Sequence, residues 1–299
     1  MAERVAVVGC GRMGRGIAAL AAQKGFGVQV LSSRAGRRDE VRSRFDADCE
    51  RMARRDPEGA AAAYERIDVC DTLDELDATL VIESVIEHVA TKLEVLRAIE
   101  EAVPPDALIG TNTSSLPLNA LAEGLNEPGR FCALHFFNPP TKMPLVEVAA
   151  AHRTSNATIE RAAAFCRSLE QTPIQVQGVP GYLVNRLMVP QLLHAIGTLS
   201  EGVGSIEAID AAMTLGASHP MGPLALADYI GLDVVLAMAR TLHAELRDPR
   251  FDPPALLVSL VEKGDLGRKS GSGFYRYQGR ERTPNRQFEG GRNDEDGRA

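Results

Sequence analysis

Two residues twelve positions apart, His135 and Glu147, have the side chains that acid–base chemistry requires. The segment between them, Asn138 to Met143, contains two adjacent prolines and predicts a turn that joins two strands. Residues that face each other across such antiparallel strands bring their side chains together. A carboxylate beside an imidazole fixes its tautomer and stabilises its charged form, so the pair can act as a general base. The alternative is structural, with His135 satisfied by a backbone group and Glu147 a charge at a sheet edge.

A glycine-rich segment near the N-terminus has the spacing of a dinucleotide-binding loop. The pattern GxGxxG lies between an apolar strand at Arg4 to Val8 and a predicted helix at Ile17 to Gln23. In this setting the first glycine permits a tight turn, the second lets the backbone approach a pyrophosphate, and the third lets helix and strand pack closely. The amides at the start of the helix are free to bind the phosphates. The residues expected to contact the cofactor here are Gly9, Gly11, Arg12, Met13 and Gly14.

The end of the next predicted strand, Val28 to Leu31, lacks the acidic residue that usually binds the ribose of NAD. Ser32 and Arg34 stand there instead, with Arg37 and Arg38 close behind. A serine cannot accept both ribose hydroxyls as a carboxylate does, whereas an arginine pairs with a 2'-phosphate. These residues therefore slightly favour NADP over NAD. If the arginines are only solvated charges at the start of a helix, NAD remains the cofactor.

Strands and helices alternate along residues 1–178. Further strands are expected at 67–70, 80–82, 107–110 and 173–177, and further helices at 39–63, 88–103 and 156–169. Such alternation predicts right-handed crossovers and a mostly parallel sheet, which is a Rossmann-type doubly wound α/β fold. Ligands of these folds bind at the carboxyl ends of the strands. We therefore expect Glu83 to Glu87, Asn112 to Ser115 and His135 to lie at that edge.

A second domain is expected after the glycine- and proline-rich segment Gly178 to Gly181. Apolar residues then follow helical spacing in four segments, at 183–200, 206–215, 224–242 and 255–262. These segments predict an all-helical C-terminal domain over residues 179–278, which we expect to form a homodimer. Residues 279–299 are polar and rich in glycine, and they predict a loose tail.

Composition narrows the class of protein. A chain of 299 residues fits two domains, and its net charge of −7 argues against nucleic-acid binding, which needs a clustered basic surface. The five cysteines show neither disulfide nor zinc spacing, so no metal site is expected. No apolar run is long enough to span a membrane, and the N-terminus shows no leader pattern, so a cytoplasmic protein is predicted.

The motifs in this order resemble those of the 3-hydroxyacyl-CoA dehydrogenase family over nearly the whole chain. They are VAVVGCGRMGRGIA at 5–18, VIESVIE at 81–87, NTSSLP at 112–117, HFFNPP at 135–140, PLVEV at 144–148, PGYLVNRL at 180–187, DAAMTLGASHPMGPLALADYIGLD at 210–233 and GRKSGSGFY at 267–275. The resemblance implies hydride transfer between a 3-hydroxyacyl thioester and NAD or NADP. It also implies that His135 is the catalytic base and Glu147 its partner.

The resemblance assigns further roles around this pair. Ser114 and Asn185 are similar to residues that hydrogen-bond the reacting oxygen and the thioester carbonyl, and Asn185 would bring the second domain to the site. Asn138 lies close to the same site by analogy. Structural alternatives are that Ser114 is a helix N-cap and Asn185 a polar group on a helix face.

Glu87 and Lys92 resemble contacts to the nicotinamide half of the cofactor or to the substrate. Their alternative is a solvated pair of charges spaced i to i+5.

Departures from the usual motifs leave the substrate open. The region between Ser32 and Ile67, where family members carry an arm that binds CoA, is short and contains no lysine. The turn reads NPPTKMPLVEV, without the usual valine or alanine after the first proline and without a lysine before the leucine. A hydroxyacyl group on an acyl carrier protein is therefore an alternative to acyl-CoA. A free hydroxy acid and a non-catalytic relative of the same fold are the others.

Overall fold

The computed structural model describes residues 4–32, 36–54, 57–279 and 281–288. The chain divides into two compact units, Met1–Tyr182 and Leu183–Ala299. The division falls one residue beyond the segment Gly178 to Gly181, where the backbone takes a left-handed conformation at Gly181, with φ 78°. Each unit has its own hydrophobic core, and each is described below by itself.

The first unit is built on one eight-stranded sheet with the order β3-β2-β1-β4-β5-β6-β7-β8. Its strands are β1 Arg4–Val8, β2 Gly27–Leu31, β3 Ile67–Cys70, β4 Leu80–Glu83, β5 Leu108–Thr111, β6 Phe131–Phe136, β7 Leu145–Ala150 and β8 Thr172–Gln177. Neighbouring strands pair in parallel everywhere except between β6 and β7, which are antiparallel. The carboxyl ends of β1 to β6 therefore lie at one edge of the sheet.

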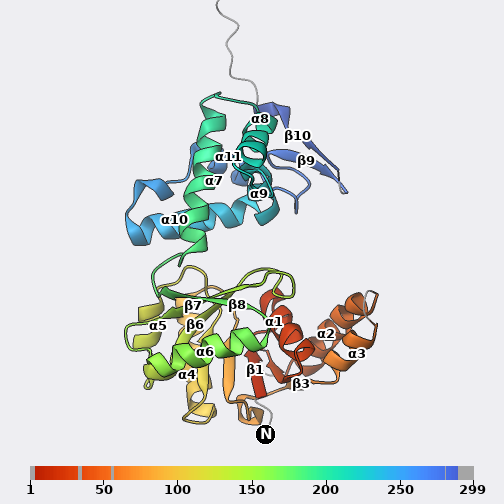
Figure 1. Ribbon diagram of the computed structural model, residues 1–299, viewed down its shortest axis with the longest axis vertical. Helices are drawn as coiled ribbons and strands as arrows, with labels where there is room; N and C mark the ends of the chain where they lie inside the picture. The colour runs from red at the N-terminus through yellow and green to blue at the C-terminus, as the bar shows by residue number, and fades with distance from the viewer. Residues whose placement is uncertain (1–3, 33–35, 55–56, 280, 289–299) are drawn as a thin grey trace, which may run out of the picture. The chain divides into compact units, whose positions relative to one another are not determined.

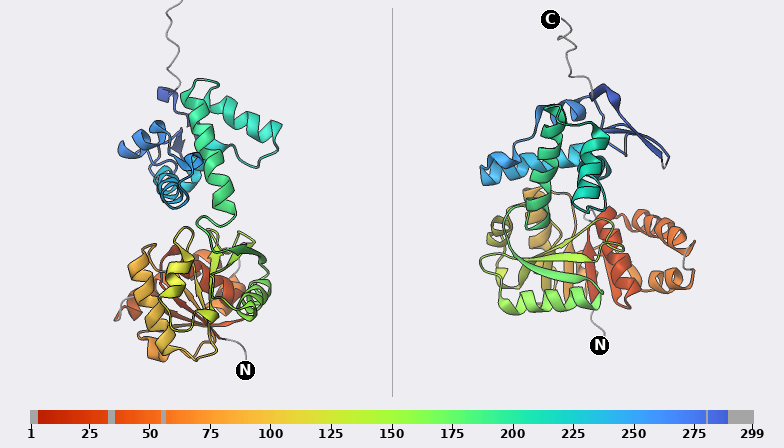
Figure 2. Two further views of the ribbon diagram at one scale, coloured as in Figure 1. Left: turned by 90° about the vertical axis from the view of Figure 1, so that its left-hand side faces the viewer. Right: turned by 45° about the horizontal axis from the view of Figure 1, so that its top comes forward.

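Helices cover both faces of this sheet, as Figures 1 and 2 show. They are α1 Arg12–Gln23, α2 Arg38–Ala53, α3 Pro57–Tyr64, α4 Val89–Ala102, α5 Leu118–Glu123 and α6 Asn156–Ser168, with 3₁₀ turns at Leu73–Glu75 and Pro128–Arg130. Helices α1 and α6 pack on one face, and α4 and α5 on the other. Because side chains alternate along a strand, Val5 and Val7 of β1 enter one core and Ala6 and Val8 the other.

This arrangement confirms the predicted Rossmann-type fold. The chain turns to one face after β1, through α1, and to the opposite face after β4, through α4. Because β1 and β4 are neighbours, the two crossovers diverge between them, and such a switch point is where doubly wound sheets bind their ligands.

The predicted helical C-terminal region is confirmed, but the second unit is not all-helical, because a strand at Tyr275–Gln278 lies inside the range 179–278. Its helices are α7 Val184–Ser200, α8 Ile206–Ala211, the π-helical turn Ala212–Gly216, α9 Pro223–Ile230, α10 Leu232–Leu246 and α11 Ala255–Glu262, with a 3₁₀ turn at Pro249–Phe251. The helix expected over residues 224–242 is two helices, because Gly231 takes a left-handed backbone with φ 105° and ends α9.

The prediction of a loose tail from residue 279 is wrong for residues 281–288. Strand β10, Glu281–Pro284, pairs antiparallel with β9, Tyr275–Gln278, and a 3₁₀ turn follows at Arg286–Phe288. Asn285 is 1% exposed, and its side chain donates to the Gly273 carbonyl oxygen at 2.9 Å. The segment is held by hydrogen bonds rather than by apolar side chains, so its composition resembles that of a tail.

A buried carboxylate, Asp228 of α9, attaches this hairpin to the helices. It accepts hydrogen bonds from the amides of Phe274 and Tyr275 and from the Tyr277 hydroxyl at 2.8–3.0 Å. Burial raises the pKa of Asp228 to about 6. A Cβ atom at Gly273 would lie 2.1 Å from the carboxylate, so the GRKSGSGFY motif needs glycine there to let the hairpin approach Asp228.

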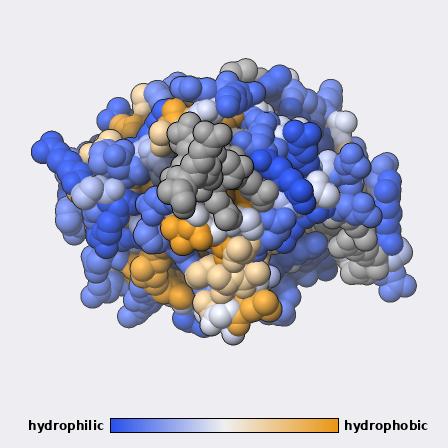
Figure 3. All heavy atoms as spheres, turned by 90° about the horizontal axis from the view of Figure 1, so that it is seen from above, coloured by the Kyte–Doolittle hydropathy of each residue, from blue (hydrophilic) through white to orange (hydrophobic). Residues whose placement is uncertain are grey.

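Several large apolar side chains of the second unit remain exposed. Leu187 is 67% exposed, Val203 71% and Leu215 85%. A groove of about 440 Å³ lies nearby in the same unit, lined in part by Val203, Ile209 and Met213. The view in Figure 3 shows hydrophobic residues gathered in a patch on a mostly hydrophilic face.

Candidate active site

The antiparallel pairing of β6 and β7 places His135 directly opposite Glu147. The imidazole Nδ1 lies 2.7 Å from the Glu147 Oε2 atom, and the Glu147 side chain is completely buried. A carboxylate only accepts hydrogen bonds, so Nδ1 carries the proton and Nε2 keeps a lone pair that can take one. Both structural alternatives are wrong, because His135 is paired with a side chain and Glu147 is not at an exposed edge. The pair has the geometry of a general base and its partner.

Two aromatic rings pack beside the imidazole. The ring of Phe137 lies 4.6 Å from that of His135 between centroids, and the ring of Tyr182 lies 5.5 Å away. Tyr182 is the last residue of the first unit and is 3% exposed. The sequence reading included Tyr182 only as part of the motif PGYLVNRL.

The predicted proline turn joins β6 to β7 and packs against α1. The amides of Lys142 and Met143 donate to the Pro139 carbonyl oxygen at 3.0 and 3.1 Å, which reverses the chain. Pro140 is buried, and a Cβ atom at Gly16 would lie 2.8 Å from its Cδ. Asn138 is exposed at the start of the turn, two residues beyond the end of β6.

The glycine loop after β1 has the geometry of a phosphate-binding turn. Gly9 is left-handed with φ 110°, and a Cβ atom there would lie 2.5 Å from the Ser84 carbonyl oxygen. A Cβ atom at Gly14 would lie 1.8 Å from the Gly9 carbonyl oxygen, whereas the space beside Gly11 is open. Helix α1 begins with no side-chain cap and no acidic residue in its first turn. Its free amides and positive dipole end therefore suit a pyrophosphate.

The other two loop residues differ in exposure. Arg12 is exposed at the first turn of α1, and Met13 is partly buried and packs on the core of that face.

The arginines expected to favour NADP are only partly described. Arg34 lies outside the described residues, and Ser32 directly follows β2. Arg37 forms an ion pair with Glu40 at 2.7 Å. Arg38 donates to the Val69 carbonyl oxygen and to the Glu75 carboxylate.

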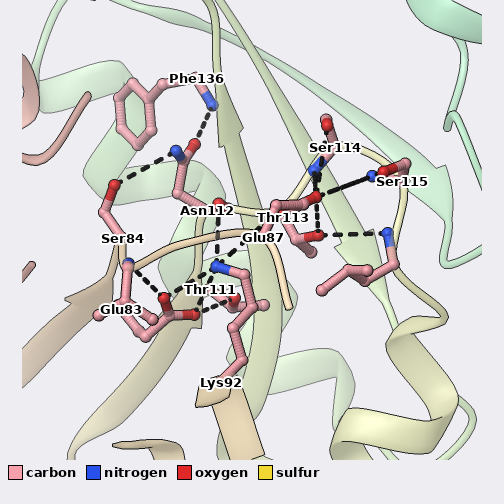
Figure 4. Close-up of polar contacts among 12 residues, drawn as sticks. Glu83, Ser84, Glu87, Lys92, Thr111, Asn112, Thr113, Ser114, Ser115 and Phe136 are labelled. Carbon is pink, nitrogen blue, oxygen red and sulfur yellow. Dashed lines mark hydrogen bonds and ion pairs between the residues drawn. The ribbon is translucent and has the colours of Figure 1, made fainter. Parts of the chain in front are cut away.

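The loop after β5 is held by one carboxylate oxygen, as the close-up in Figure 4 shows. Glu87 Oε1 accepts from the Thr113 hydroxyl at 2.6 Å and from the Ser114 amide at 2.9 Å, and the Ser115 amide lies 3.3 Å away. The Ser114 hydroxyl lies farther from the same oxygen, at 3.4 Å. Ser114 is not a helix N-cap, because α5 begins at Leu118 with Pro117 as its N-cap.

A buried ion pair lies directly behind this loop. The Lys92 ammonium, with 0% side-chain exposure, contacts both carboxylate oxygens of Glu83, also 0% exposed, at 2.8 and 3.0 Å. It also lies 3.6 Å from Glu87 Oε2. The alternative of a solvated pair is therefore wrong for Lys92. Its position indicates that the Lys92 ammonium stabilises the Glu87 carboxylate on the side away from the loop.

Sequence reasoning placed Glu83 at this edge without giving it a role, and it missed Thr111, whose hydroxyl donates to Glu83 Oε2 at 2.5 Å. The sequence did contain a signal for Glu83, which is an acidic residue at the end of an otherwise apolar strand. A carboxylate buried there requires a cation as partner.

Asn112 connects the ends of three strands. Its Oδ1 accepts from the Phe136 amide at 3.0 Å, and its Nδ2 lies 3.5 Å from the Ser84 hydroxyl oxygen. Phe136 is the residue after His135. The contact therefore ties β5 to β6 beyond their last backbone pair (Figure 4). The sequence placed Asn112 at this edge but gave it no role.

Asn185 lies in the second unit, near the start of α7, and is 6% exposed. The first unit by itself brings together His135 with Glu147, and Ser114 with Glu87 and Lys92. The role of Asn185 beside them remains a prediction.

Comparison with known families covers both units. The family model described as "3-hydroxyacyl-CoA dehydrogenase, NAD binding domain" matches residues 4–179, and the model of the C-terminal domain matches residues 181–277. The chain belongs to the 3-hydroxyacyl-CoA dehydrogenase family. The family predicted from the motifs is confirmed, and the first unit carries the NAD-binding domain of this oxidoreductase family.

Individual members of the family are similar to this chain over almost its full length. A 3-hydroxybutyryl-CoA dehydrogenase of Bradyrhizobium diazoefficiens is 40% identical, covering 95% of this chain and 98% of the relative. A probable 3-hydroxybutyryl-CoA dehydrogenase of Bacillus subtilis is 39% identical over 92% of this chain and 98% of its own. The crystal structure of (S)-3-hydroxybutyryl-CoA dehydrogenase PaaH1 from Ralstonia eutropha has a TM-score of 0.87 at 36% identity, covering 93% of this chain and 100% of that one.

Proposed function

We propose that this protein interconverts a 3-hydroxyacyl-CoA and its 3-oxoacyl form, with His135 as the acid–base residue. The observation that carries the proposal is the buried His135–Glu147 pair on neighbouring strands, close to the edge where doubly wound sheets bind ligands. In the oxidative direction, Nε2 of His135 accepts the proton of the 3-hydroxyl group while the carbon loses a hydride. Glu147 offsets the positive charge that forms on the imidazole.

The cofactor site fits a nicotinamide dinucleotide. The left-handed Gly9, the open space beside Gly11 and the uncapped start of α1 would hold its pyrophosphate. When bound, the cofactor would supply the hydride chemistry. We propose NAD as the cofactor, since the family model is of an NAD-binding domain and Arg37 and Arg38 already have acidic or carbonyl partners. NADP use, favoured by Ser32 and Arg34, is the alternative.

We assign Ser114 the role of a hydrogen-bond donor to the reacting oxygen. Glu87 already accepts shorter hydrogen bonds from Thr113 and from the Ser114 amide, so the Ser114 hydroxyl, at 3.4 Å like that of Ser115, is held only weakly. Turning that hydroxyl toward a substrate oxygen costs little, and a donor placed where charge develops stabilises the transition state. Asn185 would be a second donor, and Asn138 a neighbour of the same site.

The substrate is proposed to be a short-chain acyl-CoA, because the relatives are named 3-hydroxybutyryl-CoA dehydrogenases. An acyl-carrier-protein thioester and a free hydroxy acid are the alternatives with the same chemistry. A non-catalytic relative would have no need for the buried acid–base pair.

A substrate panel tests this function. With NADH, we expect 3-oxobutyryl-CoA to be reduced with a kcat/KM at least about tenfold above that of the matching acyl-carrier-protein thioester or free acid, because only the CoA ester supplies the full binding energy. NADPH in place of NADH should lower kcat/KM. Initial rates at 340 nm measure all six combinations of substrate and cofactor. Faster turnover of the carrier-protein thioester, or no turnover with any of them, would contradict the assignment.

We further propose a cytoplasmic homodimer. All five cysteines are free thiols, and burial raises the pKa of Cys10 to about 11, so its thiol stays protonated. No helix in the described ranges is long and apolar enough to cross a membrane, and no cluster of His, Cys, Asp or Glu there is placed to hold a metal. The exposed Val203 and Leu215 of the second unit favour burial against a second copy.

Light scattering after size exclusion tests the dimer. The wild-type chain of 32.1 kDa should elute at about twice that mass, and Leu215→Asp should shift the population toward the monomer, because a charge at an apolar interface is costly. Ile86→Asp, at a similarly exposed apolar residue of the first unit, is the control and should remain dimeric. A monomeric wild type at micromolar concentration would rule the dimer out.

A further inference from the structure

A tyrosine with an unpartnered hydroxyl is buried beside the candidate acid–base pair. Tyr182 is 3% exposed, and its hydroxyl oxygen is buried without a hydrogen-bond partner among the described residues. Buried polar groups nearly always have partners, and leaving one without a partner destabilises the folded state. A phenylalanine would fill the same space without that cost. The hydroxyl group therefore calls for an explanation other than packing.

The backbone at Tyr182 is also held in a costly conformation. Its φ of 44° is left-handed, which is unfavourable for a residue with a Cβ atom, and it follows Gly181 with φ 78°. The Tyr182 amide donates to the Val179 carbonyl oxygen at 3.1 Å, which fixes the turn. The chain keeps a large aromatic side chain at a position where glycine or asparagine would be relaxed. In this conformation the tyrosine ring packs beside the ring of His135, with 5.5 Å between the ring centroids.

The surroundings of the hydroxyl are negatively charged. Burial, and then the charges of Glu87 and Glu147, raise the pKa of Tyr182 far above its usual value, with a smaller contribution from Cys132. The phenol therefore stays protonated at any working pH. Its O–H dipole has its lowest energy with the hydrogen turned toward the carboxylates and the oxygen turned away from them.

We propose that Tyr182 is a positioning residue for the acid–base pair, its ring holding the imidazole against Glu147 and its hydroxyl lowering the proton affinity of the pair. This inference rests on the role proposed above for His135. The ring restricts the imidazole together with Phe137, which packs on it at 4.6 Å. The hydroxyl acts through charge. With its positive end turned toward the negative charge of Glu87 and Glu147, the dipole makes adding a proton to the pair less favourable than it would be beside a phenylalanine. A lower proton affinity keeps Nε2 unprotonated and ready to act as a base.

The test separates the hydroxyl from the ring. In Tyr182→Phe, the ring remains and the dipole is lost, so the pH midpoint of the His135 titration should rise by roughly half a unit, a threefold change in proton affinity. This midpoint is measured by nitrogen NMR of imidazole-labelled full-length protein without substrate, with His135 assigned by the spectrum of His135→Gln. The acidic limb of kcat/KM for oxidation should move upward by the same amount. In Tyr182→Leu, kcat should fall at least about tenfold with little change in KM, and Phe should restore most of it.

Controls distinguish this role from a structural one. Tyr277→Phe removes a hydroxyl that donates to Asp228 in the second unit and should leave the His135 titration unchanged. The melting temperature of Tyr182→Phe should equal or exceed that of the wild type, because an unpartnered group is removed. An unchanged or lowered His135 midpoint in Tyr182→Phe overturns the proposal, as does wild-type kcat in Tyr182→Leu. The NMR readout needs no turnover, so a protein inactive on hydroxyacyl-CoA whose midpoint still moves would refute the proposed function and leave the role of Tyr182 intact.

Discussion

His135→Gln is expected to lower kcat by roughly 10²- to 10⁴-fold, the range that a positioned acid–base group contributes. Glutamine keeps a polar group of similar size against Glu147 but has no lone pair that takes up a proton near neutral pH. Cofactor affinity should change little, because the glycine loop lies on β1 and α1 rather than on β6. Stopped-flow turnover with 3-oxobutyryl-CoA, and fluorescence titration with NADH, measure the two quantities separately.

Glu147→Gln should cause a loss of similar order, for a different reason. The amide that replaces the carboxylate is neutral, so it no longer offsets the charge of the imidazolium, and it can present an N–H group to the imidazole and favour the wrong tautomer. His152→Gln replaces an exposed histidine of the same unit and serves as the matched control. Wild-type turnover in either His135→Gln or Glu147→Gln would remove both residues from the mechanism. Loss of NADH binding in the same variants would indicate misfolding.

The central pair was predictable because it depends on local rules. Two strand-like segments on either side of a proline turn fix which residues face each other, and His135 and Glu147 occupy one such pair. The glycine loop was predictable for a similar reason, since a Cβ atom at Gly9 or Gly14 would collide with neighbouring backbone. In both cases the constraint lies within a short stretch of sequence.

The contacts behind the site could not be predicted because they join distant segments. Lys92 pairs with Glu83, but whether that pair is solvated or buried depends on how α4 packs against the sheet. The β9–β10 hairpin was missed because Asp228, far away in sequence, supplies the acceptors for its amides. The unpartnered hydroxyl of Tyr182 also depends on the folded environment, since nothing in PGYLVNRL distinguishes it from a packing residue.

Lys92→Met is expected to lower the free energy of unfolding by about 3–5 kcal/mol, the cost of leaving one member of a buried ion pair without its partner. Glu83 and Lys92 are both completely inaccessible, so water cannot replace the lost ammonium. Among the described residues, the Glu83 carboxylate would keep the Thr111 hydroxyl and the Val85 amide as partners. Urea unfolding followed by far-UV circular dichroism measures the loss.

The matched control is Lys24→Met. Lys24 pairs with Glu170, whose side chain is 76% exposed, and such surface pairs contribute at most about 1 kcal/mol. A second comparison adds Glu83→Gln to Lys92→Met, which removes the unpaired charge while keeping an oxygen for the Val85 amide. This double variant should recover part of the lost stability, because no charge is then left buried. If Lys92→Met costs no more than Lys24→Met, the buried pair does not hold the first unit together. The support of Glu87, and through it of Ser114, would then have to come from the loop alone.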